Sequence, residues 1–325
     1  MERSSYFVKD RALFGGYPRQ EEVDELESVG VVCFVNLTYD TERKITPYET
    51  SKKLIYFPIP DHGVPTDKVL FAGLIALLTD LIRSLEQGQR IYVHCKGGHG
   101  RSALVVSCIL HDMYRYNAEQ VIELTTIYHT QRPKLKNKWR NVVCPHHRFQ
   151  RKYVYNFCEQ IVVSRGSKTS ISNCLLLSSR FSVETELGVF PTAEAALFAY
   201  KNSHNKRLVE GLKGYDRLGM LRQTSTLRQT DTDSWLRVRF NFLERILLTR
   251  IDQWVELRDT TISTCLRPIL YHCRGDGIGD FVSSIDRNLA LPVILERIRR
   301  DLLLAHYRSN TRDGSVLGDT VNPSE

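Results

Sequence analysis

A cysteine and an arginine separated by five residues, Cys95 and Arg101, are the side chains whose types and spacing point most directly to chemistry. The apolar residues before Cys95 predict a buried strand, and those after Arg101 predict a helix. Between them lie three glycines, Gly97, Gly98 and Gly100. Glycines let successive backbone N–H groups turn inward, and the helix N-terminus adds partial positive charge at the same point. The pattern predicts a phosphate-binding loop with a thiolate at its floor, because a thiol beside an arginine ionises more readily than a free one. The alternative is a buried structural cysteine in an ordinary strand–turn–helix.

The order His-Cys, five residues, then Arg-Ser resembles the signature loop of protein tyrosine and dual-specificity phosphatases. The resemblance implies that Cys95 is the nucleophile and Arg101 the bidentate phosphate clamp. It also implies that Ser102 stabilises the departing thiolate and that His94 orients the loop. The substrate-binding residues would be Lys96, Gly97, Gly98, His99, Gly100 and, as a residue that places the hydrolytic water, Gln150. Such enzymes hydrolyse phosphate monoesters through a phosphocysteine intermediate, without a metal or another cofactor.

Hydrolysis of a phosphate ester also requires an acid that protonates the leaving oxygen. Asp61 is the candidate, because it follows a short apolar strand expected at 54–59 and lies among prolines and a glycine. The phosphatase family carries its acid on a mobile loop at about this distance before the cysteine. The alternative is a turn aspartate, which such neighbours also favour. Asp67 and Asp40 are the other candidates for the acid.

Several features bear on the substrate. Lys96 and His99 are expected as further cations beside Arg101, and phosphatases of inositol phospholipids have lysines at both of these positions. Family members that act on RNA 5′-triphosphates have Thr-His after the cysteine, which is absent here. Residues 132–152 contain eight Lys or Arg and no acid, so this run is either a solvated surface or a rim that contacts polyanions. The expected partner is a phosphorylated protein or another phosphate monoester, with inositol phospholipids and RNA 5′-phosphates as alternatives. A pseudoenzyme or adaptor that binds phosphorylated partners is the rival.

The first half of the chain alternates between expected strands and helices. Strands are expected at 30–37, 54–59 and 90–94, and helices at 21–28, 69–86, 101–114 and 118–130. This alternation predicts an α/β domain with a central, mostly parallel sheet flanked by helices. The resemblance to dual-specificity phosphatases covers about residues 6–160, so this domain is placed at 1–160. A polar segment rich in serine follows, and we expect a linker at 161–170.

The second half changes to helical periodicity. Thr192 has the type of a helix N-cap, and apolar residues recur at helical spacing over 235–250 and 291–304. We therefore expect a mostly α-helical domain at 171–308. The tail at 309–325 is rich in small and polar residues and is expected to be disordered.

The sequence from Phe190 to Lys201 resembles the NADAR family of ADP-ribose-related N-glycosidases. The resemblance implies that Glu194 is the key carboxylate and matches Lys201, Trp235 and the segment 177–181 to family positions, with Arg250 in place of a lysine. The family's Asp and Trp-Gly before its glycine-rich turn are replaced by the residues at 271–275. Asp276 or Asp280 could supply the missing carboxylate, since two carboxylates usually flank a scissile glycosidic bond. The domain would hydrolyse or bind an ADP-ribosylated substrate or be a structural remnant, and Glu194 could be only a first-turn acid that complements the helix dipole.

Composition places further bounds on the chain. Its 325 residues, 42% hydrophobic and 25% charged, are ordinary for one large or two average globular domains. The eight cysteines lack paired spacing and the polar start is unlike a signal peptide, so we expect a reducing, cytoplasmic or nuclear location. The Cys and His residues at 144–158 fit no zinc-finger spacing, so no metal site is expected. The longest apolar stretch, 69–82, is too short to span a bilayer, and no transmembrane segment is expected.

Overall fold

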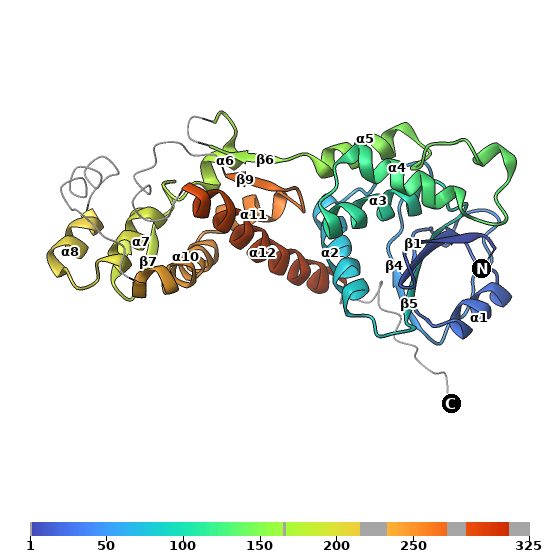
Figure 1. Ribbon diagram of the computed structural model, residues 1–325, viewed down its shortest axis with the longest axis horizontal. Helices are drawn as coiled ribbons and strands as arrows, with labels where there is room; N and C mark the ends of the chain where they lie inside the picture. The colour runs from blue at the N-terminus through green and yellow to red at the C-terminus, as the bar shows by residue number, and fades with distance from the viewer. Residues whose placement is uncertain (1, 165–166, 215–232, 272–283, 312–325) are drawn as a thin grey trace. The chain divides into compact units, whose positions relative to one another are not determined.

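The computed structural model describes residues 2–164, 167–214, 233–271 and 284–311 (Figure 1). The chain folds into two compact units. The first consists of residues 1–159 together with 303–325, and the second of residues 160–302.

A five-stranded sheet in the order β1-β2-β5-β3-β4 forms the centre of the first unit. Only β1 runs antiparallel to its neighbour, and the other strands are parallel. The strands are β1 (Ser4–Val8), β2 (Ala12–Gly16), β3 (Val31–Asn36), β4 (Lys53–Tyr56) and β5 (Arg90–Cys95). The expected mostly parallel α/β sheet is therefore confirmed for this part of the chain.

Helices cover both faces of this sheet. Figure 1 shows α1 (Gln20–Ser28) on one face and the group α2 to α5 on the other. That group comprises α2 (Lys68–Ser84), α3 (Arg101–Tyr114), α4 (Ala118–Thr130) and α5 (Arg148–Cys158), and a short 3-10 helix, η1 (Asn137–Trp139), precedes α5. Helix α3 is buried along almost its whole length, since its residues from Arg101 to Asp112 are all buried. Helix α3 thus fixes the residues at its N-terminus rigidly against β5.

The expected strand at 54–59 ends earlier than the sequence indicated, at Tyr56. Pro58 and Pro60 have no N–H to donate, so a regular ladder cannot continue. The intervening residues still follow β3: Phe57 donates a backbone hydrogen bond to Asn36 (2.9 Å), and Ile59 donates one to Leu37 (3.1 Å). These bonds hold the start of the Asp61 loop beside the carboxyl end of β3.

Helix α2 begins with a side-chain cap, because Asp67 accepts hydrogen bonds from the backbone N–H groups of Val69 (2.8 Å) and Leu70 (2.9 Å). Its middle contains Gly73, where a Cβ atom would lie 2.7 Å from the Cβ of Tyr307 and 2.9 Å from the carbonyl oxygen of Leu303. The last turns of α12 therefore pack directly on α2, within the first unit.

The described part of the second unit is helical apart from two short two-stranded sheets. Strands β6 (Ile161–Val163) and β9 (Ile269–Tyr271) pair in parallel, and β7 (Val183–Thr185) and β8 (Gly188–Phe190) form an antiparallel pair. The helices are α6 (Ser170–Leu175), α7 (Ala193–Lys201), α8 (Lys206–Gly214), α10 (Asp233–Gln253), α11 (Val255–Ser263) and α12 (Ser284–Thr311). One apolar core joins these elements.

Several expected boundaries in this half differ from those observed. The segment 161–170, expected as a linker, begins with β6, which is ordered by its pairing with β9. The last helix extends from Ser284 to Thr311, beyond the expected 291–304 and into the expected tail, and Pro292 lies inside it. The rest of that tail, 312–325, lies outside the described residues. Among the residues that the structure describes, no helix combines the length and apolarity needed to cross a bilayer.

Candidate active site

Cys95 is the last residue of β5 and lies at the floor of a cavity of about 190 Å³. It is only 3% exposed, and its Sγ lies 3.5 Å from the Oγ of Ser102 in the first turn of α3. The parallel strands end on this side of the sheet, where α/β folds place their sites. The cavity brings together most of the predicted site residues: Asp61, Cys95, Lys96, Gly97, His99, Gly100, Arg101 and Gln150 line it, with His62, Trp139 and His146.

The loop from Cys95 to Arg101 depends on its glycines. Gly98 has φ +75°, in the left-handed region, and a Cβ there would lie 2.5 Å from the backbone of Gly15. At Gly100 a Cβ would meet the Oε1 of Gln150 at 2.8 Å. Gly98 therefore needs glycine both for its conformation and for the close approach of Gly15, whereas at Gly100 the space is limited by the end of the Gln150 side chain.

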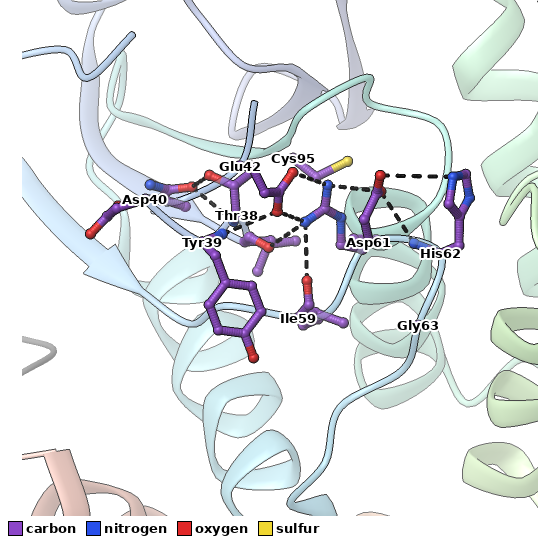
Figure 2. Close-up of polar contacts among 12 residues, drawn as sticks. Thr38, Tyr39, Asp40, Glu42, Ile59, Asp61, His62, Gly63 and Cys95 are labelled. Atoms are coloured by element: carbon purple, nitrogen blue, oxygen red, sulfur yellow. Dashed lines mark hydrogen bonds and ion pairs between the residues drawn. The ribbon is translucent and has the colours of Figure 1, made fainter. Parts of the chain in front are cut away.

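Arg101, 2% exposed, makes most of its contacts to residues outside the loop. Its Nη1 donates to the carbonyl oxygens of Ile59 (3.0 Å) and Leu37 (3.3 Å). Its Nη2 donates to Oδ1 of Asp61 (3.0 Å). Figure 2 shows the dashed contacts that reach Ile59, Asp61 and Glu42, with Glu42 and Asp61 approaching from opposite sides and Cys95 nearby. The arginine is therefore fixed by the backbone at the ends of the two neighbouring parallel strands.

Glu42 is a partner of Arg101 that the sequence did not indicate. Its two carboxylate oxygens accept from both Nη atoms of Arg101, at 2.9 Å for the Nη2–Oε2 bond, and Oε1 also accepts from the backbone N–H of Tyr39 (3.1 Å). The Glu42 side chain is 12% exposed and does not line the cavity. Burial acts to lower the pKa of Arg101, but the hydrogen bond that it donates to Glu42 and the nearby negative charges outweigh burial and raise that pKa. Arg101 is thus held charged in one orientation.

Asp61 lies on the cavity side of the same arginine. Its side chain is 49% exposed, and its carboxylate also contacts His62, with Oδ2 lying 3.7 Å from the ring Nε2. The other two candidate acids are placed differently. Asp67 caps α2, and Asp40 does not line the cavity. Of the three aspartates, only Asp61 therefore borders the space next to Cys95.

His94 is fully buried beneath the loop among aromatic rings. Its Nε2 lies 2.8 Å from the hydroxyl of Tyr48, and the rings of Tyr17 and Tyr92 pack against it. Burial lowers the pKa of His94 to about 3, so the ring is neutral at physiological pH. It borders no part of the cavity and supports the loop through packing.

His99 lines the cavity, and the surroundings of its ring favour the neutral form over the expected further cation. Burial, followed by the nearby His129 and cationic side chains, lowers its pKa to about 3. Its Nδ1 lies 2.7 Å from Nε2 of His129, and its ring stacks on Trp139 with the centroids 4.0 Å apart. The neutral ring thus forms a wall. Trp139 and His146 of this wall were not predicted, and no motif in the sequence marks them.

Gln150 connects the loop with the Asp61 segment. It is 1% exposed, and its Nε2 donates to the carbonyl oxygen of Gly63 (2.9 Å). Its amide also lies against Gly100, as described above. The side chain is therefore positioned at the wall of the cavity, between the phosphate-binding loop and the expected acid.

In the second unit, the residues matched to the N-glycosidase family lie partly together. Glu194 is 2% exposed in the first turn of α7, which Thr192 caps as predicted, and its backbone N–H donates to Leu177 (3.2 Å). Arg250 is 1% exposed and donates to the carbonyl oxygen of Leu176 (3.2 Å) and to Ser179. The segment 177–181 thus contacts both Glu194 and Arg250. Trp235 is buried in α10, and Lys201 is the last residue of α7. The predicted substitutes for the missing carboxylate, Asp276 and Asp280, lie outside the described residues.

Replacing Glu42 with glutamine should lower kcat/KM for p-nitrophenyl phosphate by roughly 10- to 100-fold, because a misplaced arginine loses its alignment with the phosphoryl group. Removal of the buried negative charge also leaves Arg101 less compensated, so a loss of thermal stability is expected. Glu49→Gln is the matched control, since Glu49 is an exposed glutamate of the same connecting segment. Steady-state kinetics that do not distinguish the two variants would contradict the positioning role of Glu42.

Comparisons with known proteins agree on the first unit. Residues 1–147 match the family model PTP-SAK, described as a Swiss Army Knife protein, DSP-PTPase phosphatase domain. The putative tyrosine phosphatase 067L of Invertebrate iridescent virus 3 is 36% identical over 167 residues, which cover 51% of this chain and 70% of the viral protein.

Two further relatives match over shorter parts of their length. The putative tyrosine phosphatase 197R of Invertebrate iridescent virus 6 is 45% identical over 123 residues, 37% of this chain and 46% of that protein. The phosphatidylglycerophosphate phosphatase PTPMT2 of Arabidopsis thaliana is 31% identical over 110 residues, 32% of this chain and 45% of that protein. The chain therefore spans about half the length of these two relatives.

Proposed function

The chain belongs to the protein tyrosine and dual-specificity phosphatase family, and from this premise we propose that it hydrolyses phosphate monoesters through a covalent phosphocysteine on Cys95. The observation that carries the mechanism is the position of the Cys95 thiol, at the floor of the cavity and below a glycine loop that ends at the N-terminus of α3. A phosphoryl group bound there would accept from loop N–H groups and from the Arg101 guanidinium. The thiolate would attack phosphorus, and Ser102, 3.5 Å from the sulfur, would stabilise that thiolate when it departs.

The contacts of Arg101 indicate how substrate would enter. Glu42 and the two carbonyl oxygens contact it from outside the cavity, whereas Asp61 contacts it from the cavity side. A phosphate dianion that binds Arg101 would therefore replace Asp61 and leave Glu42 in place. The displaced Asp61 would then lie beside the leaving oxygen and donate a proton to it, as general-acid catalysis requires.

The direct test is the hydrolysis of p-nitrophenyl phosphate by the full-length protein in the presence of EDTA. We expect turnover that the chelator does not change and that vanadate inhibits. Absence of turnover, together with retained binding of phosphate, would favour the rival function of an adaptor for phosphorylated partners.

Kinetics on a panel of substrates would identify the natural substrate class. The relative named as a phosphatidylglycerophosphate phosphatase and the basic residues at 132–152 support phospholipids as alternatives to phosphoproteins. The panel compares phosphotyrosine peptides, phosphoinositides and RNA 5′-phosphates with p-nitrophenyl phosphate. A kcat/KM that is highest for one class assigns the substrate to that class.

We further propose that the second unit hydrolyses an ADP-ribose-type N-glycoside, with Glu194 as the key carboxylate. The observation that favours this is the convergence of segment 177–181 with Glu194 and the buried Arg250. Glu194 would stabilise positive charge on the ribose carbon or activate the attacking water.

Replacing Glu194 with glutamine in the full-length chain should abolish base release from ADP-ribosylated guanine and leave hydrolysis of p-nitrophenyl phosphate unchanged. Chromatography of the released base measures the first activity, and Glu184→Gln, at an exposed position of β7, is the control. A wild-type protein that neither cleaves nor binds ADP-ribose compounds would leave the unit with a structural or partner-binding role.

A further inference from the structure

A second cavity, of about 290 Å³, adjoins the one above Cys95 and shares Gly97, His99 and Trp139 with it. Its lining contains five cationic side chains and, among the residues described there, no carboxylate: Arg3, Arg132, Lys134, Lys136 and Lys138. The stacked rings of His99 and Trp139 line both spaces. The two cavities are therefore neighbours that share an aromatic wall, and the second is strongly positive.

Arg132 is the unusual member of this group. It is 3% exposed, and its Nε and Nη2 atoms are buried without a hydrogen-bond partner among the described residues. Its guanidinium lies over the ring of Phe14, 4.4 Å from the centroid, and a Cβ on Gly98 would lie 2.6 Å from its Nη1. Arg132 thus lies directly against the phosphate-binding loop.

An uncompensated charge at this depth is costly, since burial removes its hydration. Burial lowers the pKa of Arg132 to about 10, which still leaves it positive at physiological pH. No ion pair with a carboxylate is recorded for it within the described ranges. The donors of Arg132 therefore lack an acceptor among the residues that the structure describes.

The other cations surround the opening. The Nη1 of Arg3 lies 3.6 Å from the Oε2 of Glu22, and Lys134 forms an ion pair with Glu2. Exposed ion pairs of this kind are weak, so a ligand can replace the carboxylates. Lys136 and Lys138 are exposed at the rim, where Lys138 lies 5.3 Å from the centroid of the Trp139 ring. The cavity thus combines a buried arginine with exposed lysines, an arrangement suited to a phosphate.

We propose that this second cavity binds a second phosphoryl group of the substrate, so that the enzyme prefers compact molecules that carry two phosphates. The proposal rests on the phosphatase function proposed above. One phosphoryl group would lie over Cys95 and undergo hydrolysis, while the other would remain intact and supply the acceptors that Arg132 lacks. A compact ligand is favoured over a peptide because both cavities are built around the same short loop, at Gly97 and His99.

The test measures binding to full-length Cys95→Ser by calorimetry, with soluble inositol monophosphates and inositol bisphosphates as probes. At least one bisphosphate should bind about 10- to 100-fold more tightly than its monophosphate, as expected for one or two charge-assisted hydrogen bonds. The combined change of Lys134, Lys136 and Lys138 to alanine should remove most of this preference and leave the monophosphate affinity nearly unchanged.

The matched control replaces Arg140, Arg148 and Lys152 with alanine, which removes the same charge from exposed positions of the same basic run that line neither cavity. This control should keep the bisphosphate preference. Equal losses in the two triple variants would show general attraction only and would overturn the proposal. The proposal is also overturned if Cys95→Ser without either triple change binds no bisphosphate more tightly than its monophosphate.

Arg132→Met gives an independent readout. Removing a buried charge that lacks a partner should leave the melting temperature without ligand unchanged or higher, and should abolish the extra stabilisation that a bisphosphate gives. A large loss of stability without ligand would show that Arg132 is structural and would overturn its ligand role.

Two further probes distinguish other sources of phosphate. Preference for a doubly over a singly phosphorylated peptide, without preference among inositol phosphates, would overturn the compact-ligand proposal in favour of a peptide site. Inorganic phosphate is the second probe. If it binds in the second cavity while no bisphosphate binds more tightly than its monophosphate, the cavity is a site for a free anion, which overturns the proposal. Failure of the proposed function is separate, because it appears as absent hydrolysis of p-nitrophenyl phosphate by the wild type.

Discussion

Replacement of Cys95 with serine is expected to lower kcat for p-nitrophenyl phosphate by on the order of 10⁶-fold, the size of effect seen when other hydrolases lose a covalent nucleophile. A hydroxyl is far less ionised than a thiol at neutral pH and attacks phosphorus poorly. The groups proposed to bind phosphate, in contrast, are loop N–H groups and Arg101, which the substitution does not change. Phosphate should therefore still bind, with an affinity close to that of the wild type.

Kinetics and calorimetry together measure both parts of this result. Cys158→Ser is the control, because Cys158 is a thiol outside the cavity whose pKa burial raises to about 12. That variant should keep full activity. Substantial turnover in Cys95→Ser, or trapping of ³²P on another residue in the wild type, would refute the assignment of the nucleophile.

Replacement of Asp61 with alanine is expected to lower kcat for alkyl and peptide phosphates by about 10²- to 10⁴-fold, as loss of a general acid does. The effect should shrink for aryl phosphates with acidic leaving groups, since these depart without a proton. A series of phenols of graded acidity measures this, and the slope of log kcat against leaving-group acidity should become steeper in the variant.

Asp67→Asn and Asp40→Asn are the controls for this acid. Asparagine is as good a helix N-cap as aspartate, so Asp67→Asn removes the carboxylate while keeping the cap of α2. Neither control should change the leaving-group slope. A slope that changes in either control and stays constant in Asp61→Ala would transfer the role of acid to that residue.

The catalytic loop was predictable because its determinants are local. The strand before Cys95, the glycines and the helix from Arg101 to Tyr114 all follow from neighbouring residues, and α3 has the predicted bounds. The Asp61 loop was predictable for the same reason, although the prolines within it shorten the preceding strand.

Contacts between distant parts of the chain were not predictable. Glu42 lies in a connecting segment without regular structure and contacts Arg101 across 59 positions of sequence. Strand β2 was not predicted, because its short sequence ends in two glycines that resemble a turn, yet all five of its residues are buried. His99 was expected to be charged because its type alone indicates neither its burial nor its neighbours. Such features depend on which segments the fold brings together.

Residues 303–311 belong to the first unit although the whole second unit precedes them in the chain. The chain therefore returns to the first unit after the second, and residues beyond the contiguous 1–147 match add to the packing of that unit. A fragment that stops near residue 160 would contain every side chain proposed for phosphate hydrolysis but would uncover Gly73 of α2, against which Tyr307 packs. Exposed apolar surface of this kind favours self-association. Recombination that moved residues 1–160 alone would therefore transfer the proposed catalytic residues without all of the segments that pack around them. A circular permutant that keeps residues 1–160 and 303–311 together would preserve that packing.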